Sequence, residues 1–189
     1  MEFLIRVAVL GLATVTFLAN IDNFPLRNWD EAWYAEIIKN MASGHYSFLV
    51  SFWNGQYNFD KPPLYFWLSL PFFKIFGPPA GGGEWQARIV SATSAIFATL
   101  FIYLIARRIF NRQVAVLSVL IFLTLGQIVI RFAHGNLDAL AGCLILATLY
   151  FYLAFGKLSW FLAGFSLALS YLAKGWILGL LPIIMLALF

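Results

Sequence analysis

The chain has 189 residues, of which 62% are hydrophobic and 11% are charged, and its formal net charge is +4. Soluble domains are closer to half apolar and a quarter charged, so this composition excludes an ordinary soluble protein and indicates an integral membrane protein. The positive charge is typical of cytoplasmic loops, and no basic stripe or RNA-binding motif indicates nucleic-acid binding. Cys143 is the single cysteine, which excludes an internal disulfide and a thiolate zinc site.

Apolar segments predict an all-α integral membrane protein, a helical bundle of about five to six spans. The first expected span, residues 3–21, is interpreted as an uncleaved helix that starts in the cytoplasm, because a lone arginine and no Ala-X-Ala site argue against a signal peptide. The later expected spans are residues 89–106, 114–130, 139–155, 158–173 and 176–189. Residues 1–189 are therefore expected to form a single transmembrane domain, the N-terminal part of a longer protein.

A long external loop, residues 22–88, is expected between the first two spans, with short helices lying on the membrane surface. Asn28 or Asp30 is expected to cap the first of these helices, and Asn28 with Glu31 has the spacing of a capping box. Residues 64–76 are apolar but too few to span, which indicates an interfacial or re-entrant helix.

Basic residues in the short loops predict the orientation. The arginines within residues 107–112 and Lys157 fall on one side of the predicted spans, which the positive-inside rule makes cytoplasmic. The long loop, the polar link at residues 131–138 and Lys174 then share the external face. We therefore expect a polar site at the periplasmic or external surface of a bacterial-type inner membrane.

Two adjacent acids and a lysine stand out in the long loop. Asp30 and Glu31 can deprotonate a nucleophile or hold a cation, although acids at a helix start also complement the helix dipole, and both interpretations stay open. Lys61 precedes Pro62 and Pro63, which stiffen the backbone and direct the ammonium group. An anion-binding lysine is favoured here over a snorkelling one. The combination indicates group transfer at the interface.

Three residues in the other external loops are weaker candidates. Asp138 either caps a span or acts as an acid, and His134 is more typical of a satisfied interfacial histidine than of a ligand. Lys174 snorkels by default, although Gly175 lets a ligand approach the backbone closely.

Four motifs carry a resemblance to a known family: Asp30-Glu31-Ala32-Trp33-Tyr34-Ala35, Lys61-Pro62-Pro63-Leu64, Gly135-Asn136-Leu137-Asp138 and Ala173-Lys174-Gly175. Their order resembles the GT-C membrane glycosyltransferases, in the branch of the protein O-mannosyltransferases and the lipid A aminoarabinose transferase. The resemblance covers essentially the whole chain. The first two motifs are fairly specific together, and the other two are weak alone.

The resemblance implies an inverting transfer of a sugar from a polyprenyl-phosphate carrier to a lipid, glycan or protein acceptor on the external face. Asp30 resembles the catalytic base, with Glu31 and Asp138 as further acids of the catalytic group. The expected substrate-binding residues are Lys61, Tyr34, Tyr57, Arg131, His134 and Lys174. No metal ligand is assigned, and a divalent cation is the one cofactor left open. Family members usually continue for several more spans, so the resemblance does not imply activity of these 189 residues alone.

Two other classes of protein compete with the enzyme. One is a non-catalytic subunit that binds the lipid carrier or takes part in assembly, which stays open because family members usually continue for more spans. A transporter module would place charges and broken helices near the middle of the membrane. The expected spans are almost free of ionisable groups, which disfavours transport.

Overall fold

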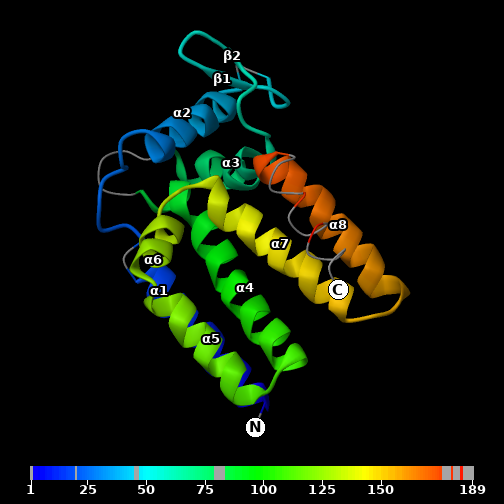
Figure 1. Cartoon of the computed structure of the whole chain (residues 1–189). Helices are drawn as coiled ribbons and strands as arrows, with labels where there is room; N and C mark the ends of the chain where they lie inside the picture. Colours follow the sequence, from blue (N-terminus) through cyan, green and yellow to red (C-terminus); the bar gives the residue numbers. More distant parts are fainter. Residues whose placement is uncertain are drawn as a thin grey trace.

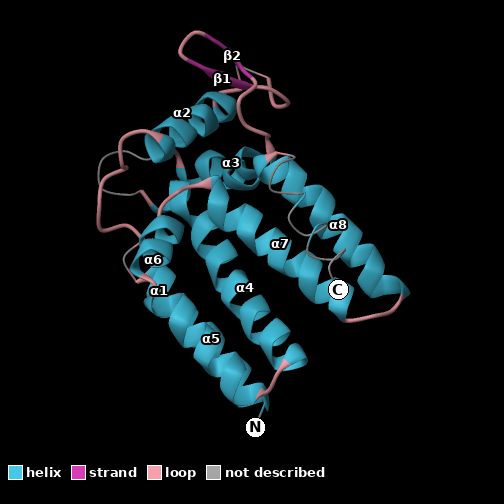
Figure 2. Cartoon of the chain, in the orientation of Figure 1, coloured by secondary structure: helices cyan, strands magenta, loops and turns pink. Residues whose placement is uncertain are grey.

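A computed structural model of the chain describes residues 2–19, 21–44, 47–78 and 84–175, together with positions 180 and 184. The described part is a bundle of helices with one small hairpin (Figures 1 and 2). Its elements are α1 (Glu2–Leu18), α2 (Asp30–Ala42), β1 (Ser51–Trp53), β2 (Gln56–Asn58), α3 (Leu64–Phe76), α4 (Trp85–Ile109), α5 (Arg112–Thr124), α6 (Gly126–Ala133), α7 (Leu137–Leu153) and α8 (Lys157–Lys174).

Helix α4 is the centre of the bundle. It contacts α1, α5 and α7, and α8 in turn packs against α7 (Figure 1). Lipid removes most of the hydrophobic driving force for helix association, so membrane helices depend on close packing. Small side chains allow that packing. The buried positions of α4 are rich in such residues, which include Ala87, Ser91, Ala92, Ser94, Ala95, Ala98 and Thr99.

Two buried clusters of side chains hold the helices together. One joins α1, α4 and α5 and includes Phe17, Tyr103 and Val119. The other joins α2 and α3 to parts of α4, α7 and α8, and its aromatic members include Tyr65 and Phe66. The second cluster fixes the loop helices on the end of the bundle.

The predicted span 114–130 is wrong as a single helix. The chain forms α5 and α6 there, and their axes are bent by 67°. Leu125 between them has an extended backbone, and Thr124 bonds back to the carbonyl of Leu120 at 2.8 Å, a contact that bends helices.

Length and apolar composition identify fewer spans than the sequence patterns predict. Among the described residues, α4 is long and apolar enough to cross a membrane, and the bent pair of α5 and α6 is a second candidate if it forms one span. Helices α3 and α7 are shorter apolar helices. The predicted sixth span, residues 176–189, lies outside the described residues except at two positions. The number of spans therefore stays a prediction.

The segment between α2 and α3 forms an antiparallel hairpin, which the all-α prediction did not include. Strands β1 and β2 pair from Ser51 with Asn58 to Trp53 with Gln56. The turn residues, Asn54 and Gly55, have φ values of 50° and 81°, as two-residue hairpin turns require. The Asn40 side chain of α2 donates to a β1 carbonyl at 3.0 Å, so the hairpin docks on α2.

The segments with the predicted site residues gather at one end of the bundle. Figure 1 shows α2, α3, the hairpin, the α6–α7 link and the last turn of α8 at this end. The α4–α5 and α7–α8 turns lie at the opposite end. This is the arrangement that alternating spans would produce.

Candidate functional site

A buried ion pair fixes the start of α2 to the bundle. The Arg88 guanidinium of α4 donates to both carboxylate oxygens of Glu31, at 2.7 and 3.2 Å, and the two side chains are only 2% and 3% exposed. Arg88 also donates to the backbone carbonyls of Ile21 and Phe24, at 2.9 and 2.8 Å. Arg88 therefore fixes both the loop before α2 and the first turn of α2 to α4.

The Glu31 carboxylate has further partners in the backbone. It accepts hydrogen bonds from the N–H groups of Arg27 and Gly135, each at 2.8 Å. Burial raises the pKa of the Glu31 carboxyl, but the hydrogen bonds from Arg88 and from these two amides outweigh it, and the net pKa lies below its ordinary value. This carboxylate is enclosed by a guanidinium and backbone amides, and its predicted catalytic role stays a prediction.

The predicted capping box does not form, because the N-cap of α2 is Trp29 and no side chain caps the helix. Trp29 has a φ of 74° and a ψ of −122°, a backbone conformation that is rare and strained for a bulky residue. Its side chain is 88% exposed. Asp30, the first residue of α2, is also exposed, and it forms no ion pair with another described residue.

Hydrogen bonds and close packing also fix the Gly135–Asn136 link, which joins α6 to α7. The Asn136 side chain caps α7 by accepting from the Asp138 N–H at 2.6 Å. The Ser91 hydroxyl accepts from the Asn136 N–H and donates to its carbonyl, each at 2.8 Å. A Cβ on Gly135 would lie 2.5 Å from the Ala87 carbonyl oxygen, so only glycine fits. This weak sequence motif sets the position of Asp138, which does not itself cap the helix.

Asp138 lies between two cations from two other helices. Arg131 of α6 donates to its Oδ2 at 2.9 Å, and Lys174 at the end of α8 pairs with its Oδ1. The prediction placed Arg131 and Asp138 in one external link and Lys174 in another, and in the structure Asp138 contacts both cations.

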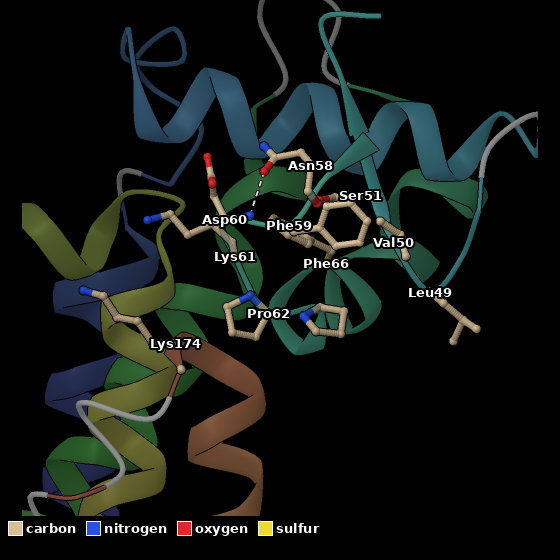
Figure 3. Close-up of a pocket in the computed structure, with 12 residues that line it drawn as sticks. Leu49, Val50, Ser51, Asn58, Phe59, Asp60, Lys61, Pro62, Phe66 and Lys174 are labelled. Carbon is tan, nitrogen blue, oxygen red and sulfur yellow. Dashed lines mark hydrogen bonds between the residues drawn. The ribbon is translucent and has the colours of Figure 1, made fainter. Parts of the chain in front are cut away.

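Lys61 and Lys174 line the same cavity, which we call the lysine cavity (Figure 3). Its volume is about 540 Å³, and its walls come from the hairpin, the start of α3 and the residues that end α8. Figure 3 shows the two lysine side chains extending to the same side. The Lys61 ammonium also lies 5.7 Å from the centroid of the Trp33 ring, in a cation–π contact. Lys174 also pairs with Asp138, so an anion beside these lysines would share the Lys174 ammonium group with the Asp138 carboxylate.

Asp30 lines a neighbouring cavity of about 390 Å³ with Arg131 and His134. Arg131 therefore connects this cavity to the lysine cavity, because it also contacts Asp138, which pairs with Lys174. His134 ends α6, and its Nδ1 contacts the backbone carbonyl of Ile130. Within the described ranges, no group of three His, Cys, Asp or Glu side chains is placed to hold a metal ion.

The two predicted tyrosines do not line the lysine cavity. The ring of Tyr34 is 5% exposed and packs in the core against Tyr65 and Phe66. Tyr57 on β2 is 56% exposed and meets Phe52 edge to face. Neither residue is among those that line the lysine cavity. Their contact with a substrate stays a prediction.

Sequence reasoning missed Arg88, which lies next to the predicted span 89–106. The available signal was a single arginine at the start of an apolar helix, since a charge there requires a partner. The distant acid that serves as partner could not be read from local spacing.

A helical membrane bundle with a charged site at one end, covered by a long loop, defines a GT-C type of architecture. The sequence profile described as dolichyl-phosphate-mannose-protein mannosyltransferase matches residues 60–189, more than half of the chain. The chain therefore belongs to the dolichyl-phosphate-mannose-protein mannosyltransferase family.

Individual relatives match this chain over different lengths. An undecaprenyl phosphate-alpha-4-amino-4-deoxy-L-arabinose arabinosyl transferase of Pseudomonas aeruginosa (strain UCBPP-PA14) is 28% identical over 177 residues, which are 89% of this chain and 31% of the relative. An uncharacterized protein of Aquifex aeolicus is 41% identical over 75 residues, 40% of this chain and 17% of that protein.

A solved structure has a similar fold over nearly the whole chain. The crystal structure of ArnT from Cupriavidus metallidurans bound to undecaprenyl phosphate matches with a TM-score of 0.81 and 26% identity, covering 96% of this chain and 34% of that one. The chain thus spans about a third of the length of ArnT and of the Pseudomonas relative.

Proposed function

We propose that the chain forms the carrier-binding and base-supplying part of a GT-C glycosyltransferase, which moves a sugar from a polyprenyl-phosphate carrier to an acceptor hydroxyl on the external face. The observation that carries this proposal is the convergence of Lys61 and Lys174 on one cavity. Lysine is an effective point charge for phosphate. The similar ArnT structure was solved bound to undecaprenyl phosphate, which supports the same class of ligand.

The three predicted acids have different surroundings, and this separates their roles. Glu31 is enclosed by Arg88 and backbone amides, and Asp138 is held between Arg131 and Lys174. Asp30 is exposed at the start of α2 and lines a cavity. We assign the base to Asp30, a structural role to Glu31, and to Asp138 the positioning of the two cations.

The transfer follows from this assignment. The acceptor hydroxyl attacks the anomeric carbon while the bond from that carbon to the phosphate oxygen breaks, and Asp30 takes the hydroxyl proton. A positioned base of this kind accelerates a reaction about 10²–10⁴-fold. Negative charge develops on the leaving phosphate, where Lys61 and Lys174 stabilise it. Attack opposite the leaving group inverts the anomeric configuration.

The test uses the protein expressed from its complete gene, reconstituted in liposomes with a sugar-charged undecaprenyl phosphate and lipid A as one acceptor. We expect a product whose anomeric configuration, read by NMR, is opposite to that of the donor. A product with retained configuration would contradict the single-displacement mechanism. Binding of the carrier with no transfer to any lipid, glycan or peptide acceptor would instead favour the non-catalytic subunit.

A further inference from the structure

A third cavity at the same end of the molecule has no role in the mechanism above. Its volume is about 660 Å³, and we call it the aromatic cavity because three tryptophans line it, together with Asn28, Ala32 and Asp60. The tryptophans come from three segments: Trp29 before α2, Trp33 within α2 and Trp53 on β1. The Trp33 and Trp53 rings lie with centroids 5.6 Å apart and planes inclined by 56°.

The aromatic cavity adjoins both halves of the proposed site. Asp60 lines it and also the lysine cavity, while Asn28 and Trp29 line it and also the cavity of Asp30. The Lys61 ammonium is 5.7 Å from the centroid of the Trp33 ring. A phosphate that contacts Lys61 therefore lies beside this indole, and a group esterified to the phosphate extends next to the same wall.

The lining suits a ring that is apolar on its faces and polar at its edge. Aromatic faces carry partial negative charge and attract the C–H groups of a saturated ring. Asn28 and Asp60 offer an amide and a carboxylate to hydroxyl groups, a few polar groups on a largely apolar wall. A pyranose ring has this chemistry.

We propose that the aromatic cavity binds a pyranose ring stacked on the indoles of Trp33 and Trp53. This inference rests on the proposed function, because it takes Lys61 as the phosphate contact. The ring is either the sugar carried by the donor or a sugar of a saccharide acceptor, and the chemistry of the cavity is the same for both.

The test changes Trp53, which is 38% exposed on the hairpin and so can be replaced with little damage to the core. Trp53→Leu removes the ring and Trp53→Tyr keeps one. Trp160→Leu, at an exposed position on α8, is the matched control. The protein from the complete gene, in detergent, is titrated with undecaprenyl phosphate alone, with the same carrier charged with mannose or with 4-amino-4-deoxyarabinose, and with lipid A.

A donor-sugar site predicts that Trp53→Leu weakens binding of a charged carrier about tenfold, the size of one aromatic contact, and leaves the bare carrier unchanged. Trp53→Tyr should keep most of the affinity, and Trp160→Leu all of it. A loss confined to lipid A would also support the pyranose site and assign it to the acceptor. Unchanged binding of every probe, or an equal loss for bare and charged carriers, would overturn the proposal and leave Trp53 as an interfacial aromatic residue.

Failure of the underlying function gives a different result. If the wild-type protein does not bind bare undecaprenyl phosphate, or if Lys61→Ala binds it normally, the phosphate site itself is wrong. Both of those results come from the bare carrier and Lys61, so they do not depend on what happens at Trp53.

Discussion

Arg88 and Glu31 pair at 2.7 Å where each side chain is almost completely buried. The pair brings together α4, the start of α2 and the α6–α7 link, because Glu31 also accepts from the Gly135 amide. It holds the backbone on both sides of Asp30 while the Asp30 side chain stays exposed. A reactive carboxylate is best presented by a backbone that is held rigidly.

Loss of this pair should destabilise the fold. Glu31→Gln leaves the buried guanidinium without its counter-charge and should cost about 3–5 kcal/mol of unfolding free energy. Glu36→Gln in the same helix removes only an exposed pair with Lys39, worth less than about 1 kcal/mol. Thermal unfolding of the two variants in detergent compares them. Equal losses of stability would show that the buried pair is not what fixes α2.

The same carboxylate should make stability depend on pH. The folded-state pKa of Glu31 is lowered from its ordinary value of 4.5, so the group stabilises the fold above that pH and loses this effect as the pH falls through its folded pKa. The difference in melting temperature between wild type and Glu31→Gln should therefore be large at neutral pH and shrink below pH 4.5. A difference that stays constant with acidification would contradict the lowered pKa.

Orientation in the membrane is open to a direct test. Asn54 lies in the hairpin turn at the site end, and Asn111 lies in the α4–α5 turn at the opposite end. In intact cells an impermeant thiol reagent should label Asn54→Cys and spare Asn111→Cys. The natural cysteine, Cys143, is buried and gives little background. The reverse pattern of labelling would place the site in the cytoplasm.

Asp30→Asn should separate catalysis from binding. The substitution keeps the shape of the side chain and removes its basicity, so turnover should fall about 10²–10⁴-fold. Affinity for undecaprenyl phosphate should stay close to that of the wild type, because the proposed phosphate contacts are the lysines and not Asp30. A transfer assay and a binding assay on one preparation give both values. Near-normal turnover would show that Asp30 is not the base.

Local patterns in the sequence predicted most of the helices and the residues that carry charge. The apolar run at residues 64–76 matches α3 at both ends, and the polar link at residues 131–138 does join two helices. The signals for these features come from residues that are close together in the sequence. The hairpin also had a local signal, since Asn54-Gly55 favours a two-residue turn, but the aromatic residues around it were not interpreted as strands.

The missed features depend on residues far apart in the chain. Glu31 and Arg88 pair across 57 positions, and nothing near either residue identifies the other. The bend at Leu125 is an exception, because Thr124, Gly126 and Gln127 beside it interrupt the apolar run that was interpreted as one span. The contact of Asp138 with Lys174 likewise joins residues far apart in the sequence and requires the packing of α7 and α8.

Binding of bare undecaprenyl phosphate to Lys61→Ala, with Lys74→Ala as the control, tests the central claim most directly. Lys61 lines the lysine cavity, whereas Lys74 is an exposed lysine near the end of α3, so the two variants lose the same charge at different places. A charge-assisted contact to phosphate is worth about 1.5–3 kcal/mol, so Lys61→Ala should bind the carrier about 10–100-fold more weakly than the wild type. Lys74→Ala should bind it normally. Equal affinities for the two variants would contradict the assignment of the lysine cavity as the carrier-phosphate site.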